Sequence, residues 1–172
     1  ALSADPIEVP KAGYYEPGVG VVPTSPLRGG RTTGPGGGRS SSADQTAPVI
    51  PILFYRSMLL AADVAPIDAM TAELRQSGIA AIPIFVSSLK DRTSLAFVEA
   101  AFAAHAPTAI ITATAFASGA EPGAETLFDR AGVPVFQVIV ATTRRDAWQT
   151  NQRGLAPADL AMHVVLPELD GR

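Results

Sequence analysis

Residues 49–55 form the most constraining stretch of the sequence. They read Val-Ile-Pro-Ile-Leu-Phe-Tyr, an uninterrupted apolar run that stops at Arg56 and Ser57, and residues 50–55 are the first predicted strand. A strand without polar alternation must be covered on both faces, which is typical of a central strand in a parallel sheet flanked by helices. Ligands of open α/β sheets lie outside the carboxyl ends of the strands. We therefore expect a binding site close to Arg56, Ser57 and Asp63.

The chain after this strand repeats the pattern. The further predicted elements are, in order, helix 66–76, strand 80–86, helix 93–104, strand 109–113, helix 125–131, strand 133–140, helix 143–148, helical turn 157–162 and strand 164–166. Strands that alternate with helices at this spacing indicate right-handed parallel crossovers. The predicted fold class is α/β, a three-layer, doubly wound, mostly parallel sheet that is flavodoxin-like or Rossmann-like.

The first 48 residues differ in composition from the rest, and we predict two regions. Residues 1–48 are an extended segment and flexible linker rich in Gly, Pro and Ser, and residues 49–172 are the α/β domain. The glycine-rich run at 28–42 could be a phosphate-binding loop or a linker. The linker is favoured, because a phosphate loop follows a strand and opens a helix. The apolar residues at 13–15 and 19–22 could form one strand or dock on a neighbour.

Composition excludes several classes of function. The net charge is -3, which argues against a nucleic-acid partner, because phosphate binding needs a basic face. There is no cysteine, which excludes disulfides and thiolate sites and is compatible with a reducing compartment such as the cytoplasm. No apolar run approaches the ~20 residues of a membrane span. Only 17% of residues are charged, so the domain could bury part of its surface against something else.

Polar residues gather where the predicted strands end. Hydroxyl and guanidinium groups at one edge of a sheet suit a ligand with carboxylates or amides. The alternative is that they cap the following helices, which is the favoured interpretation for Thr143, paired with Asp146 in a capping box. The candidate substrate-binding residues are Arg56, Ser57, Asp63, Ser87, Thr114 and Arg144.

Two carboxylates, Glu168 and Asp170, follow the last predicted strand. They could bind a divalent metal with water completing the shell, or they could belong to a turn made by Pro-Glu-Leu-Asp-Gly. The spacing favours the turn. The histidines His105 and His163 do not have the spacing of metal ligands. The residues alone therefore indicate an α/β ligand-binding domain without an identified catalytic residue.

Several motifs in the chain resemble those of a known family. They are Phe-Tyr-Arg-Ser at 54–57, Ile-Pro-Ile-Phe-Val-Ser-Ser-Leu-Lys-Asp at 82–91 and Met-His-Val-Val-Leu-Pro-Glu-Leu-Asp-Gly-Arg at 162–172. With them, residues 53–172 resemble the large subunit of cobaltochelatase, the CobN family, which is related to the large H-type subunit of magnesium chelatase. The magnesium enzymes tend to have histidine where this chain has Met58. The segment at 13–17 is similar too, with Glu16 where the family leads us to expect histidine.

The resemblance implies an ATP-dependent metal chelatase, a ligase that forms nitrogen–metal bonds. The parent subunit would bind a tetrapyrrole and insert cobalt(II), its substrate metal, into hydrogenobyrinic acid a,c-diamide in cobalamin biosynthesis. ATP would be used by separate AAA+ partner subunits and not by this chain. The chain, which has no initiator Met, looks like an N-terminal fragment that packs on the remainder of the subunit and is inactive alone. Alternatives are a magnesium chelatase acting on protoporphyrin IX and a non-catalytic α/β binding or interaction domain.

Overall fold

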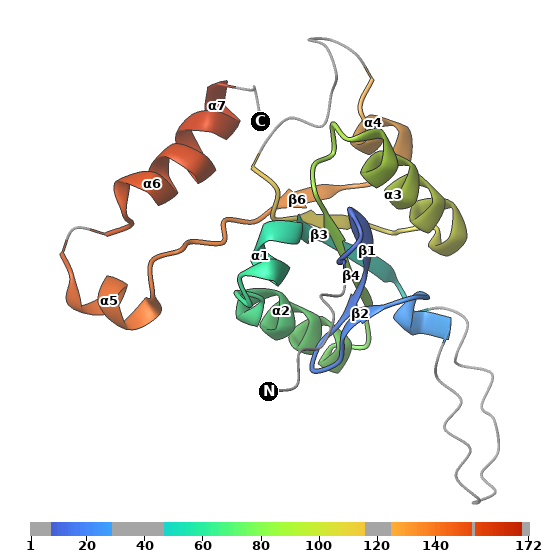
Figure 1. Ribbon diagram of the computed structural model, residues 1–172, viewed down its shortest axis with the longest axis horizontal. Coiled ribbons are helices and arrows are strands. Elements are labelled where there is room, and N and C mark those ends of the chain that lie inside the picture. Colours follow the sequence, from blue (N-terminus) through green and yellow to red (C-terminus); the bar gives the residue numbers. More distant parts are fainter. Residues whose placement is uncertain (1–7, 29–46, 116–124, 153, 170–172) are drawn as a thin grey trace, which may run out of the picture.

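The fold is built on one mixed β-sheet (Figure 1). The computed structural model describes residues 8–28, 47–115, 125–152 and 154–169. The strand order is β2-β1-β4-β3-β5-β6. The strands are β1 (Ala12–Glu16), β2 (Gly20–Val22), β3 (Val49–Tyr55), β4 (Ala80–Val86), β5 (Ile110–Thr112) and β6 (Val135–Gln137). Strands β3 to β6 are parallel to one another, and β1 and β2 form an antiparallel hairpin beside β4.

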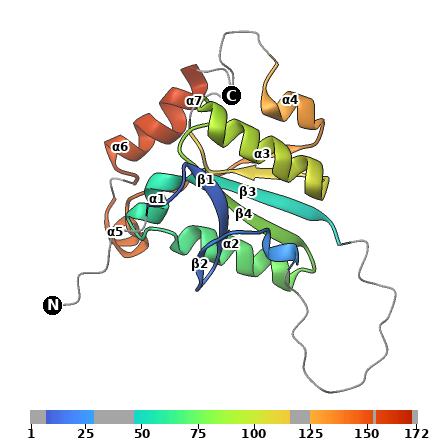
Figure 2. The ribbon, with the colours of Figure 1, turned by 45° about the vertical axis from the view of Figure 1, so that its right-hand side comes forward.

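Helices cover both faces of this sheet. The helices of the described chain are η1 (Pro26–Arg28), α1 (Arg56–Leu60), α2 (Ala65–Gln76), α3 (Arg92–His105), α4 (Leu127–Ala131), α5 (Arg145–Thr150), α6 (Pro157–Leu160), η2 (Ala161–Val165) and α7 (Leu166–Leu169), of which α1 to α4 cover the sheet. Helices α3 and α4 lie on one face and α1 and α2 on the other (Figure 2). This confirms the predicted three-layer α/β fold. The order β4-β3-β5-β6 in the parallel part is the flavodoxin-like one.

The core surrounds β3 and β4, as the apolar runs predict. Ile52, Leu53 and Phe54 are fully buried, although they point alternately to opposite faces of the sheet. Leu53 packs with Val98 and Phe102 of α3, whereas Phe54 packs with Ile67 of α2. Both faces of β3 are therefore covered, which explains why its sequence has no polar alternation.

The N-terminal hairpin differs from the prediction. Residues 12–16 and 20–22, which the composition assigns to a segment before the α/β domain, are strands of its sheet. Tyr15 is buried in the core and packs edge-on against Phe54, with ring centroids 5.7 Å apart. Short strands among glycines and prolines give a weak local signal, so the pairing of β1 with β4 could not be predicted. The glycine-rich linker lies mostly outside the described residues.

The C-terminal part also differs. The strand predicted at 164–166 is wrong, because η2 and α7 make this stretch helical. Two adjacent valines favour a strand only where a neighbouring strand can pair with them, and here Val164 and Val165 are 45% and 51% exposed, away from the sheet. The strand predicted at 133–140 pairs only along residues 135–137, since β5 itself has three residues.

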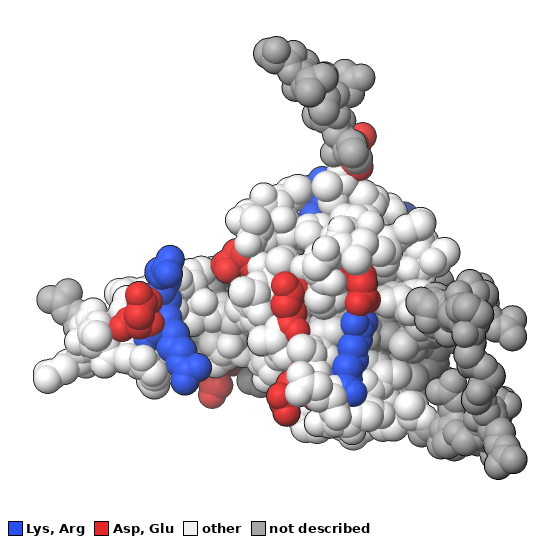
Figure 3. Space-filling model, turned by 90° about the horizontal axis from the view of Figure 1, so that it is seen from below, with Lys and Arg blue, Asp and Glu red and all other residues white. Residues whose placement is uncertain are grey.

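Residues 142–169 form a helical extension that we call the C-terminal arm. It leaves the body after β6 and lies to one side of the sheet (Figure 1). On the face shown in Figure 3, basic and acidic side chains stand side by side at the arm rather than in a patch of one sign. Within the described parts of the chain, no helix is long and apolar enough to cross a membrane.

Candidate functional site

A cleft opens between the body and the C-terminal arm, at the carboxyl edge of the parallel strands. It has a volume of about 750 Å³. A smaller cavity of about 180 Å³ shares Asp63 and Thr142 with it and is otherwise lined by apolar side chains and Tyr55. We call the two together the carboxyl-edge cleft. Its lining residues with polar side chains are Tyr55, Asp63, Thr142, Thr143, Arg144, Arg145, Asp146 and Gln149.

Two of the predicted substrate-binding residues, Asp63 and Arg144, line this cleft from opposite sides. Asp63 lies in the tight turn between α1 and α2, where its backbone N–H donates to the Met58 carbonyl over 2.8 Å. Arg144 precedes α5, and its Nε atom lies 3.5 Å from a carboxylate oxygen of Asp146. Both side chains of this pair are largely exposed, so the guanidinium is available to a ligand. The strand-end rule thus located the cleft.

Arg56 and Ser87 have a different position. Arg56 donates from Nε to the Pro10 carbonyl over 3.0 Å and from Nη2 to the Val9 carbonyl over 2.7 Å. Ser87 donates from Oγ to the Lys11 carbonyl over 3.0 Å. Both side chains hold the segment that leads into β1, and neither is among the residues that line the cleft. The sequence could not indicate this role, because it depends on the pairing of β1 with β4.

Thr114 and Ser57 also lie outside the cleft lining. Thr114 is buried, and its Oγ1 atom is 2.8 Å from Oγ1 of Thr112. Ser57 is exposed in the first turn of α1. Thr114 therefore supports the chain just after β5, between the two alanines at 113 and 115 that line the smaller cavity.

Asp159, which sequence reasoning missed, holds the loop that carries Arg144. Its side chain is only 1% exposed. Its carboxylate accepts hydrogen bonds from the backbone N–H and the hydroxyl of both Thr142 and Thr143. Burial raises the pKa of Asp159, but the four hydrogen bonds outweigh it and lower the pKa to about 2. The carboxylate thus stays charged and fixes the rim of the cleft.

This contact corrects the predicted capping box of Thr143 and Asp146. The N-cap of α5 is Arg144, which makes no side-chain capping bond. The Thr143 hydroxyl instead donates to Asp159 and accepts from the Ala156 N–H over 3.2 Å. A hydrogen bond to a charged carboxylate is stronger than one between neutral groups, so the hydroxyl turns to Asp159. No local spacing rule could indicate a contact between residues that lie 16 positions apart.

The predicted metal-binding pair, Glu168 and Asp170, is only partly described. Glu168 lies on α7, a helix rather than the end of a strand. Asp170 lies outside the described residues. Among the residues that the structure describes, no three His, Cys, Asp or Glu side chains are grouped so as to hold a metal ion. Metal binding by Glu168 and Asp170 stays a prediction.

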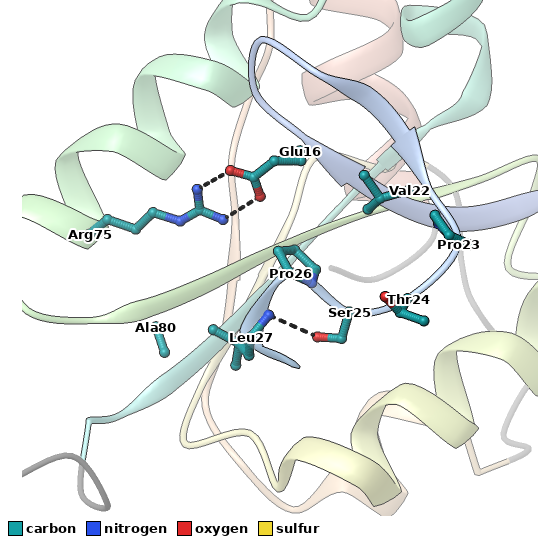
Figure 4. Close-up of a pocket in the computed structure, with 9 residues that line it drawn as sticks. All are labelled: Glu16, Val22, Pro23, Thr24, Ser25, Pro26, Leu27, Arg75 and Ala80. Atoms are coloured by element: carbon teal, nitrogen blue, oxygen red, sulfur yellow. Dashed lines mark hydrogen bonds and ion pairs between the residues drawn. The ribbon is translucent and has the colours of Figure 1, made fainter. Parts of the chain in front are cut away.

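A second cavity of about 560 Å³ lies at the amino end of β4 (Figure 4). One wall is an ion pair, in which Arg75 donates from Nη1 and Nη2 to the two Glu16 carboxylate oxygens over 2.6 and 2.9 Å. Arg75 also donates to the Ala81 carbonyl over 3.2 Å. The hydrogen bonds to Glu16 raise the pKa of Arg75 further, so the guanidinium is fully charged. This pair ties the hairpin to α2 and β4, which makes it a structural contact.

Replacing Glu16 with Gln is expected to lower the free energy of unfolding by about 0.5–1.5 kcal/mol, because the bidentate bond is lost while Arg75 is still partly reached by water. Urea denaturation measures this loss. The matched control is Glu99→Gln, which breaks a more exposed pair with Arg130 and is expected to change stability by less than about 0.5 kcal/mol. Equal losses in the two variants would show that the Glu16–Arg75 pair does not hold the hairpin.

Comparisons with known proteins agree with the resemblance. A family model described as CobN/Magnesium Chelatase matches residues 2–172. The aerobic cobaltochelatase subunit CobN of Sinorhizobium sp is 38% identical over 94% of this chain, and its Pseudomonas aeruginosa counterpart is 42% identical over 73%. The large H-type subunit of magnesium chelatase from Rhodobacter capsulatus is 27% identical over 98% of the chain.

This chain spans only 12%, 10% and 14% of the lengths of these three relatives. A solved structure, the catalytic subunit of cobaltochelatase from Mycobacterium tuberculosis, has the same fold, with a TM-score of 0.60 over 97% of this chain and 13% of that one. Its sequence identity of 24% is low, so this likeness concerns the fold alone. The match of the family model over nearly every residue shows that the chain belongs to the CobN/magnesium chelatase family.

Proposed function

We propose that this chain is the α/β domain of a large, tetrapyrrole-binding subunit of cobaltochelatase. The subunit would insert cobalt(II), as substrate metal, into hydrogenobyrinic acid a,c-diamide in an ATP-dependent step of cobalamin biosynthesis. The observation that carries the proposal is the difference in identity, 38% to a cobaltochelatase subunit against 27% to a magnesium-chelatase subunit, each over most of the chain. Methionine at position 58, where the magnesium enzymes tend to have histidine, points the same way.

The carboxyl-edge cleft suits part of such a ligand. Its larger cavity of about 750 Å³ is within the ~300–1,000 Å³ typical of small-molecule sites, whereas the cavity of about 180 Å³ is too small for a ring. We propose that the larger cavity takes the edge of the corrin and that the smaller, mostly apolar one takes a single substituent. Arg144 and Arg145 offer guanidinium groups to carboxylates, and the Thr142 hydroxyl oxygen, whose proton is donated to Asp159, can accept from an amide N–H.

The remaining parts of the reaction belong to other components. The resemblance to the CobN family implies that ATP is hydrolysed by separate AAA+ partner subunits, and the lack of a Gly-x-x-x-x-Gly-Lys-Ser/Thr sequence in this chain is consistent with that assignment. Most of the metal-insertion site is assigned to the remainder of the large subunit, since the chain spans 12% of a cobaltochelatase relative. Glu168 and Asp170 remain proposed metal-binding residues, of which Glu168 lies on α7.

Isothermal titration calorimetry of the full-length subunit with hydrogenobyrinic acid a,c-diamide tests the cleft. Arg144→Ala is expected to weaken binding about tenfold, which corresponds to the loss of one charge-assisted hydrogen bond of ~1.4 kcal/mol. The matched control is Arg130→Ala on α4, which is not among the residues lining the cleft and should bind as the wild type does. Unchanged binding in Arg144→Ala would remove the cleft from the corrin site.

A second candidate is a stand-alone α/β interaction domain without chemistry. It is favoured by one observation: Arg56 and Ser87, two of the expected substrate-binding residues, hold the segment before β1 instead of lining the cleft. Reading the coding sequence beyond the codon for Arg172 separates the two candidates. An open reading frame of several hundred further codons supports the large subunit, and a stop codon close to Arg172 supports the stand-alone domain.

A further inference from the structure

Strand β6 has the sequence of a buried strand but lies at the edge of the sheet. The run 133–140 is apolar at every position except Gln137, and no charged residue occurs between Arg130 and Arg144. The same kind of run in β3 is buried along most of its length. In and after β6, by contrast, Val135 is 38%, Phe136 57% and Ile139 50% exposed.

The outer edge of β6 is open within the described part of the chain. Its described pairing partner is β5, and the strand order ends with β6. Phe136 pairs with Ile111 of β5, so its side chain lies on the face of the sheet that α1 and α2 cover. These helices bury Ile52 and Phe54 of β3, but they leave Phe136 exposed. Exposed edge strands normally carry charges that prevent further pairing. The lack of charge here indicates that another strand covers this edge.

We propose that the open edge of β6 is an interaction surface for an apolar strand from the remainder of the same subunit, which extends the parallel sheet. The inference rests on the part of the proposed function that makes this chain a domain of a longer subunit. It is supported by the Mycobacterium tuberculosis structure, in which the same fold forms only 13% of a much longer chain. The occupant is a strand with its own apolar faces, recognised through backbone hydrogen bonds and through Phe136 and Ile139.

A second copy of this chain is the less suitable occupant. The paired part of β6 has only three residues, and a stable interface between separate molecules buries about 1,200 Å² or more. Two free chains would also lose translational and rotational freedom on association. A strand in the same polypeptide has a high effective concentration, so a short edge suffices to hold it.

Hydrogen exchange tests this inference, comparing the present chain alone with the full-length subunit. The amides among residues 135–139 that face the outer edge, those of residues 135, 137 and 139, are expected to exchange at least about tenfold more slowly in the full-length subunit, whereas the Val138 N–H already donates to the Thr112 carbonyl of β5. The reference is helix α3, whose amides are bonded within the helix and not at an edge of the sheet, and where exchange should stay within about twofold. Equal exchange of the outer-edge amides in both proteins would overturn the inference. Slowing in the isolated chain as its concentration is raised would assign the edge to a second copy and overturn it as well.

Two variants of the full-length subunit sharpen the test. Phe136→Lys should restore fast exchange at residues 135, 137 and 139, because a charge on β6 opposes the apolar partner strand. Val19→Lys, at a side chain that is 72% exposed, should leave that exchange slow. Protection that persists in Phe136→Lys would contradict docking through this side chain. Cobalt insertion is a separate readout: a subunit that protects β6 but inserts no cobalt would disprove the proposed reaction and leave this surface standing.

Discussion

Replacing Phe54 with Ala is expected to lower the free energy of unfolding of the chain by about 3–5 kcal/mol. Phe54 is fully buried in β3 and packs edge-on against Tyr15 and Phe85, with ring centroids 5.7 and 6.4 Å away. The three rings join β1, β3 and β4, so the cavity left by the substitution cannot be closed by one side chain. Since domains are typically stable by only about 5–15 kcal/mol, a large part of the stability would be lost. Urea denaturation followed by circular dichroism measures it.

The control for this prediction is the same substitution at Phe136. This side chain is 57% exposed on β6, so Phe136→Ala should change the free energy of unfolding of the chain alone by no more than about 0.5 kcal/mol. Similar losses for the two variants would contradict the assignment of β3 as the centre of the core. A large loss at Phe136 alone would instead place the core near β6.

Replacing Asp159 with Ala is expected to detach the C-terminal arm while the body stays folded. Four hydrogen bonds from Thr142 and Thr143 to the buried carboxylate would be lost, which removes about 1–3 kcal/mol from the anchoring of the arm. A loss of this size increases the population of the detached arm about 5- to 150-fold. Limited proteolysis within the arm should accelerate by a similar factor, and the proposed corrin binding by the full-length subunit should weaken because Arg144 is no longer held at the cleft.

The pH dependence of the same contact gives an independent test. The folded-state pKa of Asp159, about 2, is below the ~3.9 of an unfolded chain. The carboxylate therefore contributes its full stabilisation above about pH 4 and loses it as the pH falls towards 2. The single tryptophan, Trp148, lies in α5 and reports on the arm by its fluorescence. We expect its emission to shift between about pH 4 and pH 2.

Two variants separate Asp159 from the other carboxylates. Asp91 also has a pKa lowered to about 2, by Lys11 and by the N–H of Ser94, but it caps α3 in the body of the domain. Asp159→Asn should abolish the acid shift of Trp148 emission, and Asp146→Asn, an exposed change on α5, should keep it. An unchanged shift in Asp159→Asn would show that another group releases the arm.

The parts of the fold that the sequence predicts are those determined by local hydrophobic periodicity. Strands β3 and β4 and helices α2 and α3 follow from their apolar runs within about a residue at each end. The sequence predicts the hairpin of β1 and β2 less well. Its strands have only five and three residues and lie among glycines, so their pattern is too short to be recognised without the partner strand. The strand predicted at Val164 and Val165 is wrong for the opposite reason. Their β-branched side chains indicate a strand, but the chain is helical there.

The residues of the candidate site also fall into two groups, those indicated by local sequence and those whose roles depend on contacts between distant residues. The strand-end rule depends only on where strands stop, and two of the six residues that it indicated, Asp63 and Arg144, line the cleft; substrate binding by them stays a prediction. The role of Asp159 depends on its meeting with Thr142 and Thr143 in space, and the roles of Arg56 and Ser87 depend on the course of residues 9–11. None of these contacts leaves a spacing that can be recognised in a single sequence.

The most direct test of the proposed function is an assay of metal insertion by the full-length subunit together with the proposed ATPase subunits. Cobalt is expected to enter hydrogenobyrinic acid a,c-diamide only when ATP is present, as followed by the change in absorption of the corrin. Magnesium is expected not to enter protoporphyrin IX under the same conditions. Insertion of magnesium into protoporphyrin, with no cobalt entering the corrin, would contradict the proposed function and assign the chain to the magnesium branch of the family.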